Sequence, residues 1–80
     1  MIYEVEYVLK TEKLKTYTEE FHTLSLAKQF VERVETNHNA RKILVYKVNS
    51  SMPGCEKHLI YKLDNVCYST YTTDEYGKGQ

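Results

Sequence analysis

Two stretches decide the fold of this chain: TLSLAKQFVERV (23–34) and KILVYKV (42–48). In the first, apolar residues recur at the spacing that forms one stripe along a helix; they are Leu26, Ala27, Phe30, Val31 and Val34. Thr23 precedes this stripe, and a hydroxyl at that position accepts hydrogen bonds from the backbone N–H groups of a first helical turn. We expect one amphipathic helix that ends near residues 37–39, because asparagine tolerates the left-handed conformation that closes a helix.

The second stretch is typical of a central strand, because it is rich in β-branched and aromatic residues on both faces. Upstream, residues 2–9 alternate apolar and acidic side chains, which indicates a half-buried strand. Residues 14–21 are expected to return beside it after a tight polar loop. In that register Tyr7 pairs with Tyr17 and Tyr3 with Phe21, on the core side.

A hairpin is expected near the C-terminus, with strands at residues 58–63 and 66–72 and a two-residue turn at Asp64-Asn65. This register predicts the pairs Leu63–Val66, Tyr61–Tyr68, Leu59–Thr70 and Lys62–Cys67. It places Tyr61 and Tyr68 on the core side, as it does Tyr3 and Tyr7 in the first strand.

The expected order is therefore β-β-α-β-β-β, an α+β fold whose sheet is mostly antiparallel with spatial order 2-1-3-4-5. Eighty residues suffice for one hydrophobic core, so residues 1–73 form one domain. Residues 74–80 are expected to be a flexible polar tail. With one helix to cover the sheet, the other sheet face is left open to solvent or to a partner.

Composition narrows the function classes. The formal net charge is zero, which removes the strongest sign of a dedicated nucleic-acid binder. The first residues are acidic where a secretion signal is basic, and no run approaches the ~20 apolar residues of a membrane span. We expect a cytoplasmic protein in which Cys55 and Cys67 are free thiols.

Catalytic and metal-binding patterns are weak. Cys55 and His58 have a C-x-x-H spacing, but a structural zinc site takes four ligands, and within a strand these two side chains face opposite ways. Neither cysteine lies in a signature typical of nucleophilic catalysis. Glu4 and Glu6 are expected on the solvent-facing side of the first strand, where nothing would desolvate them for acid–base work. The sequence predicts no enzyme, metal or cofactor.

Tyrosine stands out, with eight residues and no tryptophan. Tyrosine is enriched where proteins meet other proteins, because it joins a large apolar ring to a polar tip. Tyr71, Tyr76 and Tyr46 are the candidates for exposure, and with the acidic Glu4 and Glu6 they form the predicted partner-binding set.

An alternative function is the binding of single-stranded nucleic acid on an open sheet, through tyrosines that stack on bases and a basic middle segment. The candidate residues of that segment are Arg41, Lys42, Lys47, Lys57 and Lys62.

Phe21–Val31 and Lys42–Val48 together resemble a strand-helix-strand cassette found in short proteins of bacteriophages and mobile elements. The resemblance covers less than half of the chain and carries no catalytic motif. It implies a stoichiometric binder, an inhibitor or modulator that blocks a host protein of defence or transcription. A homodimer that covers the open face is a further alternative.

Overall fold

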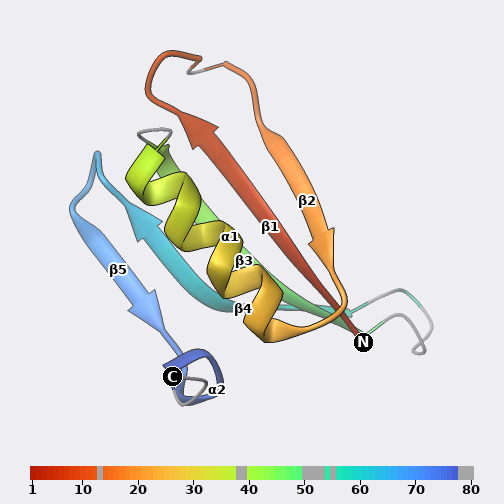
Figure 1. Ribbon diagram of the computed structural model, residues 1–80. Helices are drawn as coiled ribbons and strands as arrows, with labels where there is room; N and C mark the ends of the chain where they lie inside the picture. The colour runs from red at the N-terminus through yellow and green to blue at the C-terminus, as the bar shows by residue number, and fades with distance from the viewer. Residues whose placement is uncertain (13, 38–39, 50–53, 55, 78–80) are drawn as a thin grey trace.

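The computed structural model describes residues 1–12, 14–37, 40–49, 54 and 56–77. These form β1 (Ile2–Leu9), β2 (Tyr17–Phe21), α1 (Leu24–Asn37), β3 (Ala40–Asn49), β4 (Glu56–Asp64), β5 (Ser69–Thr72) and α2 (Asp74–Gly77). The strands build one sheet in the order β2-β1-β3-β4-β5, and every neighbouring pair is antiparallel. Helix α1 lies across one face of this sheet (Figure 1). The α+β fold and the strand order predicted from the sequence are both confirmed.

The first hairpin has the predicted register, with Tyr7 opposite Tyr17 and Tyr3 opposite Phe21. The Tyr7 and Tyr17 rings stack with their centroids 5.2 Å apart. Strand β2 begins at Tyr17, later than the predicted residue 14, because the chain is still turning there. The Lys15 N–H donates to the Glu12 carbonyl at 3.1 Å, which closes a turn before the strand.

Helix α1 begins as predicted, since the Thr23 hydroxyl accepts a hydrogen bond from the Leu26 N–H at 3.2 Å. Its sheet-facing side buries Ala27, Val31 and Val34. The predicted stripe was wrong at Leu26, which is exposed. A helix turns about 100° per residue, and this rotates Leu26 away from the buried line.

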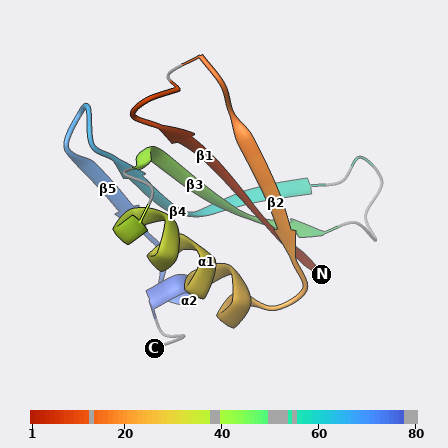
Figure 2. The same ribbon diagram turned by 45° about the horizontal axis from the view of Figure 1, so that its top comes forward.

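The core lies between α1 and the central strands, and Figure 2 shows the helix stacked on one side of the sheet. Its members share near-complete burial and come from both layers; they are Val5, Ala27, Val31, Val34, Ala40, Ile43, Val45, Ile60 and Tyr76. Successive strand residues point to opposite faces. Ile43 and Val45 therefore face α1, whereas Leu44 and Tyr46 face away from it.

The β4–β5 register differs from the prediction. Leu63 lies opposite Thr70 and Lys62 opposite Tyr71, so four residues rather than two connect the strands. The Asp64 side chain accounts for the longer turn, because one of its oxygens accepts from the N–H groups of Val66 at 2.9 Å and Cys67 at 3.1 Å. These bonds hold the pKa of Asp64 below its usual range.

The longer turn removes Tyr68 and Cys67 from the sheet. Tyr68 has a positive φ of 52° and is 92% exposed, so its predicted place on the core side was wrong. Cys67 is an exposed free thiol in the turn instead of a partner for Lys62. Cys55 lies outside the described residues.

The chain does not fray at residue 74, because Asp74–Gly77 form α2. Tyr76 is 8% exposed and belongs to the core, which overturns its predicted exposure. Its ring stacks on that of Tyr61, with the centroids 4.4 Å apart. The rest of the predicted tail, residues 78–80, lies outside the described residues.

Candidate functional site

The sheet face turned away from α1 is the first candidate, and we call it the uncovered face. The strand registers assign its residues by alternation. Across β3 and β4 the register shifts by one residue after Val45, so Lys62 lies opposite Leu44 and Leu59 opposite Tyr46. The uncovered face includes Ile2, Glu4, Glu6, Val8, Thr18, Glu20, Lys42, Leu44, Tyr46, Val48, Lys57, Leu59, Lys62, Asp64, Ser69 and Tyr71.

Both helices lie on the opposite side. Lys28 of α1 donates to the Tyr76 carbonyl of α2 at 2.8 Å, and Lys47, which shares the face of Val45, binds Glu75 at 2.7 Å. Within the described residues, therefore, no helix covers the face that carries Leu44 and Tyr46.

Glu4, Tyr46 and Lys57 form a charged and aromatic cluster on the uncovered face. The Glu4 carboxylate binds the Lys57 ammonium at 2.8 Å, and the same ammonium lies 5.8 Å from the centre of the Tyr46 ring. Glu4 is 9% exposed, so the expectation that it is freely solvated was wrong. A carboxylate so well covered needs its partner charge, which makes this pair part of the folded surface.

The electrostatics of the cluster follow from its packing. The pKa of Tyr46 is raised, first by burial and then by the negative charge of Glu6. The pKa of Lys57 is raised by its hydrogen bond to Glu4. At neutral pH the phenol stays protonated and the ammonium stays charged, so the cluster offers hydrogen bonds and fixed charges to a partner.

Beside Leu44, Tyr46 and Val48 the charges of this face are sorted by strand, whereas at one end Lys42 of β3 lies opposite Asp64 of β4. Glu4 and Glu6 lie on β1, whereas Lys57 and Lys62 lie on β4. Between them, β3 carries Leu44, Tyr46 and Val48, and these side chains are half-buried. The face thus has an apolar centre between an acidic and a basic flank.

Four of the five predicted partner-binding residues share this face: Glu4, Glu6, Tyr46 and Tyr71. Tyr71, which is 49% exposed, lies beside Lys62 at the β5 edge. Tyr76 is the exception, since it packs on the α1 side.

The five predicted nucleic-acid residues do not share one surface. Lys47 lies on the α1 side and is paired with Glu75, and Lys57 is paired with Glu4. Lys42 and Lys62 lie on the uncovered face, next to Asp64 in the pairing of β3 with β4. Arg41 lines a hollow of about 270 Å³ at the sheet end with Val8, Lys42, Asp64 and Cys67.

That end hollow offers little chemistry among the residues that line it. The thiol of Cys67 has no histidine beside it there, and the Asp64 carboxylate is engaged by the backbone of its own turn. A nucleophilic cysteine requires a base within hydrogen-bonding reach.

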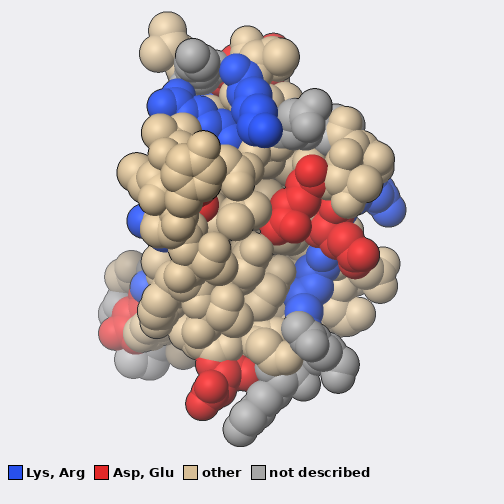
Figure 3. All heavy atoms as spheres, turned by 90° about the vertical axis from the view of Figure 1, so that its left-hand side faces the viewer, with Lys and Arg blue, Asp and Glu red and all other residues tan. Residues whose placement is uncertain are grey.

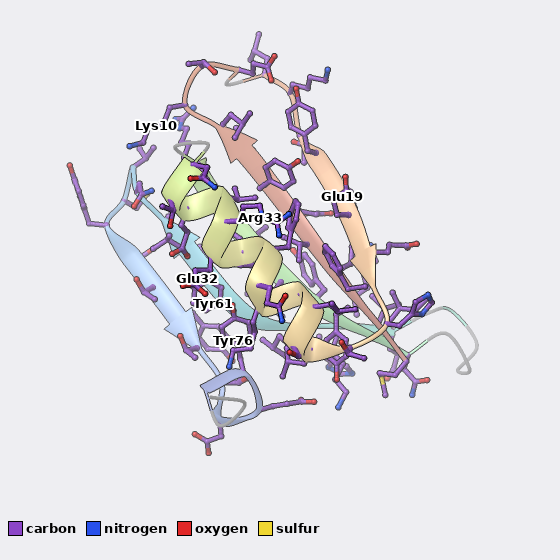
Figure 4. All side chains as sticks on the ribbon, viewed as in Figure 1. Lys10, Glu19, Glu32, Arg33, Tyr61 and Tyr76 are labelled. Carbon is purple, nitrogen blue, oxygen red and sulfur yellow. The ribbon has the colours of Figure 1, made fainter. Side chains whose placement is uncertain are left out.

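A second hollow, of about 450 Å³, lies between α1 and the β4–α2 corner and is lined in part by Lys28, Glu32, Glu35, Tyr61 and Tyr76. Figure 4 shows Glu32 next to the Tyr61 and Tyr76 side chains. Figure 3, in which the left-hand side of Figure 1 faces the viewer, shows acidic side chains gathered beside an uncharged surface. The Tyr61 hydroxyl donates to Glu35 at 3.0 Å.

The two phenols of this hollow serve the fold. Burial raises the pKa of Tyr76 to about 12, and burial together with the bond to Glu35 raises the pKa of Tyr61. Both therefore stay protonated near neutral pH and hold α2 against the sheet. The sequence shows that a tyrosine, Tyr76, follows the last strand. It does not show that this ring stacks on Tyr61, because the two residues are separated by a strand and a turn.

Within the parts of the chain that the structure describes, no group of three or more His, Cys, Asp or Glu side chains is arranged to hold a metal ion. No described helix is long and apolar enough to cross a membrane. Comparisons with protein-family models, with curated proteins and with solved structures found no match.

Proposed function

We propose that this chain is a non-enzymatic protein-binding module that binds its partner through the uncovered face. One observation carries the proposal: the face joins an apolar and aromatic centre on β3 to charged flanks on β1 and β4. Protein interfaces have the same anatomy, with an apolar core enriched in tyrosine inside a polar rim.

The side chains with shifted pKa values favour a role in binding over a role in catalysis, because each is engaged in the fold. The phenols of Tyr61 and Tyr76 are bound up in packing, and the Asp64 carboxylate holds a turn. Glu4 and Lys57 neutralise one another on the uncovered face. Each of these groups already has a partner that fixes the shape of the surface.

The class of partner follows from the resemblance of residues 21–48 to a cassette of short bacteriophage proteins. Such proteins often act by occupying a surface of a host protein, and we propose that this module inhibits or redirects a host component of defence or transcription. Stoichiometric binding needs only a stable complementary face, which an eighty-residue domain can supply.

The alternative, single-strand nucleic-acid binding, has less support. An electrostatic groove that follows a nucleic-acid backbone needs basic residues along one surface. Lys47 and Lys57 lie on opposite faces, and each is already paired with a glutamate.

The test is an affinity capture from candidate host lysate with three forms of the protein: wild type, Leu44→Asp and Gln29→Asp. Leu44 is at the centre of the uncovered face, whereas Gln29 is exposed on the far side of α1. We expect one stoichiometric protein that survives nuclease, is lost with Leu44→Asp and is kept with Gln29→Asp. Partners that disappear with nuclease would favour the nucleic-acid alternative.

A further inference from the structure

The uncovered face is complementary to itself. Glu6 and Lys62 lie opposite Leu44 from its two sides, one on β1 and the other on β4, so all three belong to one row across the sheet. The acidic and the basic residue are thus each one strand spacing from the centre.

We infer that the uncovered face binds a second copy of this chain. The two sheets pack face to face about a two-fold axis that runs nearly parallel to β3. This inference rests on the proposed function, because it names one protein that binds to the proposed face. A half-turn about this axis places β1 of each chain over β4 of the other and leaves β3 over β3.

The strand pairings determine which residues meet. Glu6 of each chain comes opposite Lys62 of the other, and Leu44 packs on Leu44. One row further along, the Glu4–Lys57 ion pair lies beside Tyr46 in each chain. At the other end of β3, Lys42 of one chain comes near Lys42 of the other, and Asp64 lies beside each lysine. Two oppositely charged pairs thus flank a shared apolar seam.

The charge pattern selects this axis over the other in-plane choice. A two-fold axis running across the strands would place β1 over β1 and β4 over β4. Glutamates would then oppose glutamates and lysines would oppose lysines, and such like-charge contacts disfavour association. Both in-plane axes keep the strands of the two sheets within the ~30° of aligned packing, so the charges make the choice.

The size of the face also suits a dimer. Five strands about 4.8 Å apart span roughly 24 Å, and the ten residues of β3 at about 3.3 Å each span roughly 33 Å. The product, roughly 800 Å², is an upper limit on the footprint, because β2 and β5 are shorter than β3, and it is of the same order as the area that each partner buries in a standard interface. A host protein that takes the same face competes with the second copy.

Charge reversal tests the pairing. The variants Glu6→Lys and Lys62→Glu each create two like-charge pairs in a homodimer, so we expect each alone to dimerise about tenfold more weakly, or worse. Mixed together, they regain opposite charges at both positions, and we expect a heterodimer. The double variant E6K/K62E regains the pairs as well and should dimerise like wild type.

Association is measured by sedimentation equilibrium over a wide range of protein concentration, with circular dichroism to verify the fold of each variant. Glu32→Lys is the matched control, because Glu32 is exposed on α1 and its reversal leaves the uncovered face unchanged. A wild type that stays monomeric at every concentration overturns the inference. A dimer whose dissociation constant is unchanged by both charge reversals overturns it as well.

A second measurement needs no variant. Wild-type protein mixed with its nitrogen-15-labelled form is treated with a carbodiimide, which joins touching carboxylates and amines as amides. A cross-linked peptide that pairs labelled with unlabelled chain and contains Glu6 and Lys62 supports the inference. A dimer whose intermolecular cross-links avoid both residues contradicts it.

The two proposals fail in different ways. The double variant keeps the dimer but presents reversed charges to any other protein, so it should lose a captured host protein. A monomeric wild type that still captures a partner through Leu44 refutes self-association and leaves the proposed function standing. A dimer that captures no host protein refutes the proposed binding of a host protein and leaves self-association standing.

Discussion

The two faces of the sheet differ most clearly at consecutive residues of β3. Ile43 is fully buried under α1, whereas Leu44 on the next position is only half-buried on the uncovered face. Both residues are large and aliphatic, and both belong to the same central strand. The difference therefore comes from the layer above them, and it separates residues that hold the fold from residues that are available to a partner.

The largest expected effect is on the α1 side. Ile43→Ala should lower the free energy of unfolding by about 3 kcal/mol, because it removes buried methyl groups and leaves a cavity. Leu44→Ala in the same strand should lower it by about 1 kcal/mol, since Leu44 loses less contact. Urea unfolding of dilute protein measures both. Should Ile43→Ala not fold, Ile43→Val is expected to cost about 1 kcal/mol. Equal losses at positions 43 and 44 would show that the faces do not differ as described.

A smaller effect is expected from the tyrosines. Tyr76→Ala should cost about 2–3 kcal/mol, because it removes the ring that stacks on Tyr61 and holds α2. Tyr71→Ala, on the uncovered face, should cost less than about 1 kcal/mol. Hydrogen exchange gives a local measure, since the Gly77 N–H donates to the Thr73 carbonyl in the wild type. We expect the Gly77 N–H to exchange faster in Tyr76→Ala and at the wild-type rate in Tyr71→Ala. An unchanged exchange rate in Tyr76→Ala would mean that the ring does not hold α2.

The smallest effect concerns pH. Burial raises the pKa of Tyr76 from 10.0 to about 12, so the folded state favours the protonated phenol. Stability from this group is complete below pH 10 and declines as the pH rises through about 12. Tyrosinate absorbance should accordingly show a late-ionising component that shrinks in Tyr76→Phe. A titration curve whose alkaline end is the same in Tyr76→Phe and in wild type would contradict the burial of this phenol.

Local sequence patterns were enough to predict β1, the start of α1 and the pairing of Tyr7 with Tyr17. Each of these depends on alternation, on a capping hydroxyl or on a short connection between neighbouring strands. The strand order also followed, because antiparallel neighbours with short connections leave few arrangements.

The candidate site was predictable in part. Alternation along β1 was sufficient to place Glu4 and Glu6 away from the core, and both share the uncovered face with Tyr46, a predicted candidate for exposure. The burial of Glu4 was missed, since it depends on Lys57, a residue more than fifty positions away along the chain. The β4–β5 turn was missed as well, because its length depends on the bonds of the Asp64 side chain to two backbone N–H groups.

By itself, the sequence determined the class of the fold, the sheet order and the long helix α1, because hydrophobic periodicity and short connections act between near neighbours. Only the tertiary structure decided which tyrosines are buried, which charges are paired and that Glu6 and Lys62 flank Leu44 symmetrically. Those outcomes depend on which distant segments pack together, and packing is specified by the whole chain at once rather than by any stretch of it.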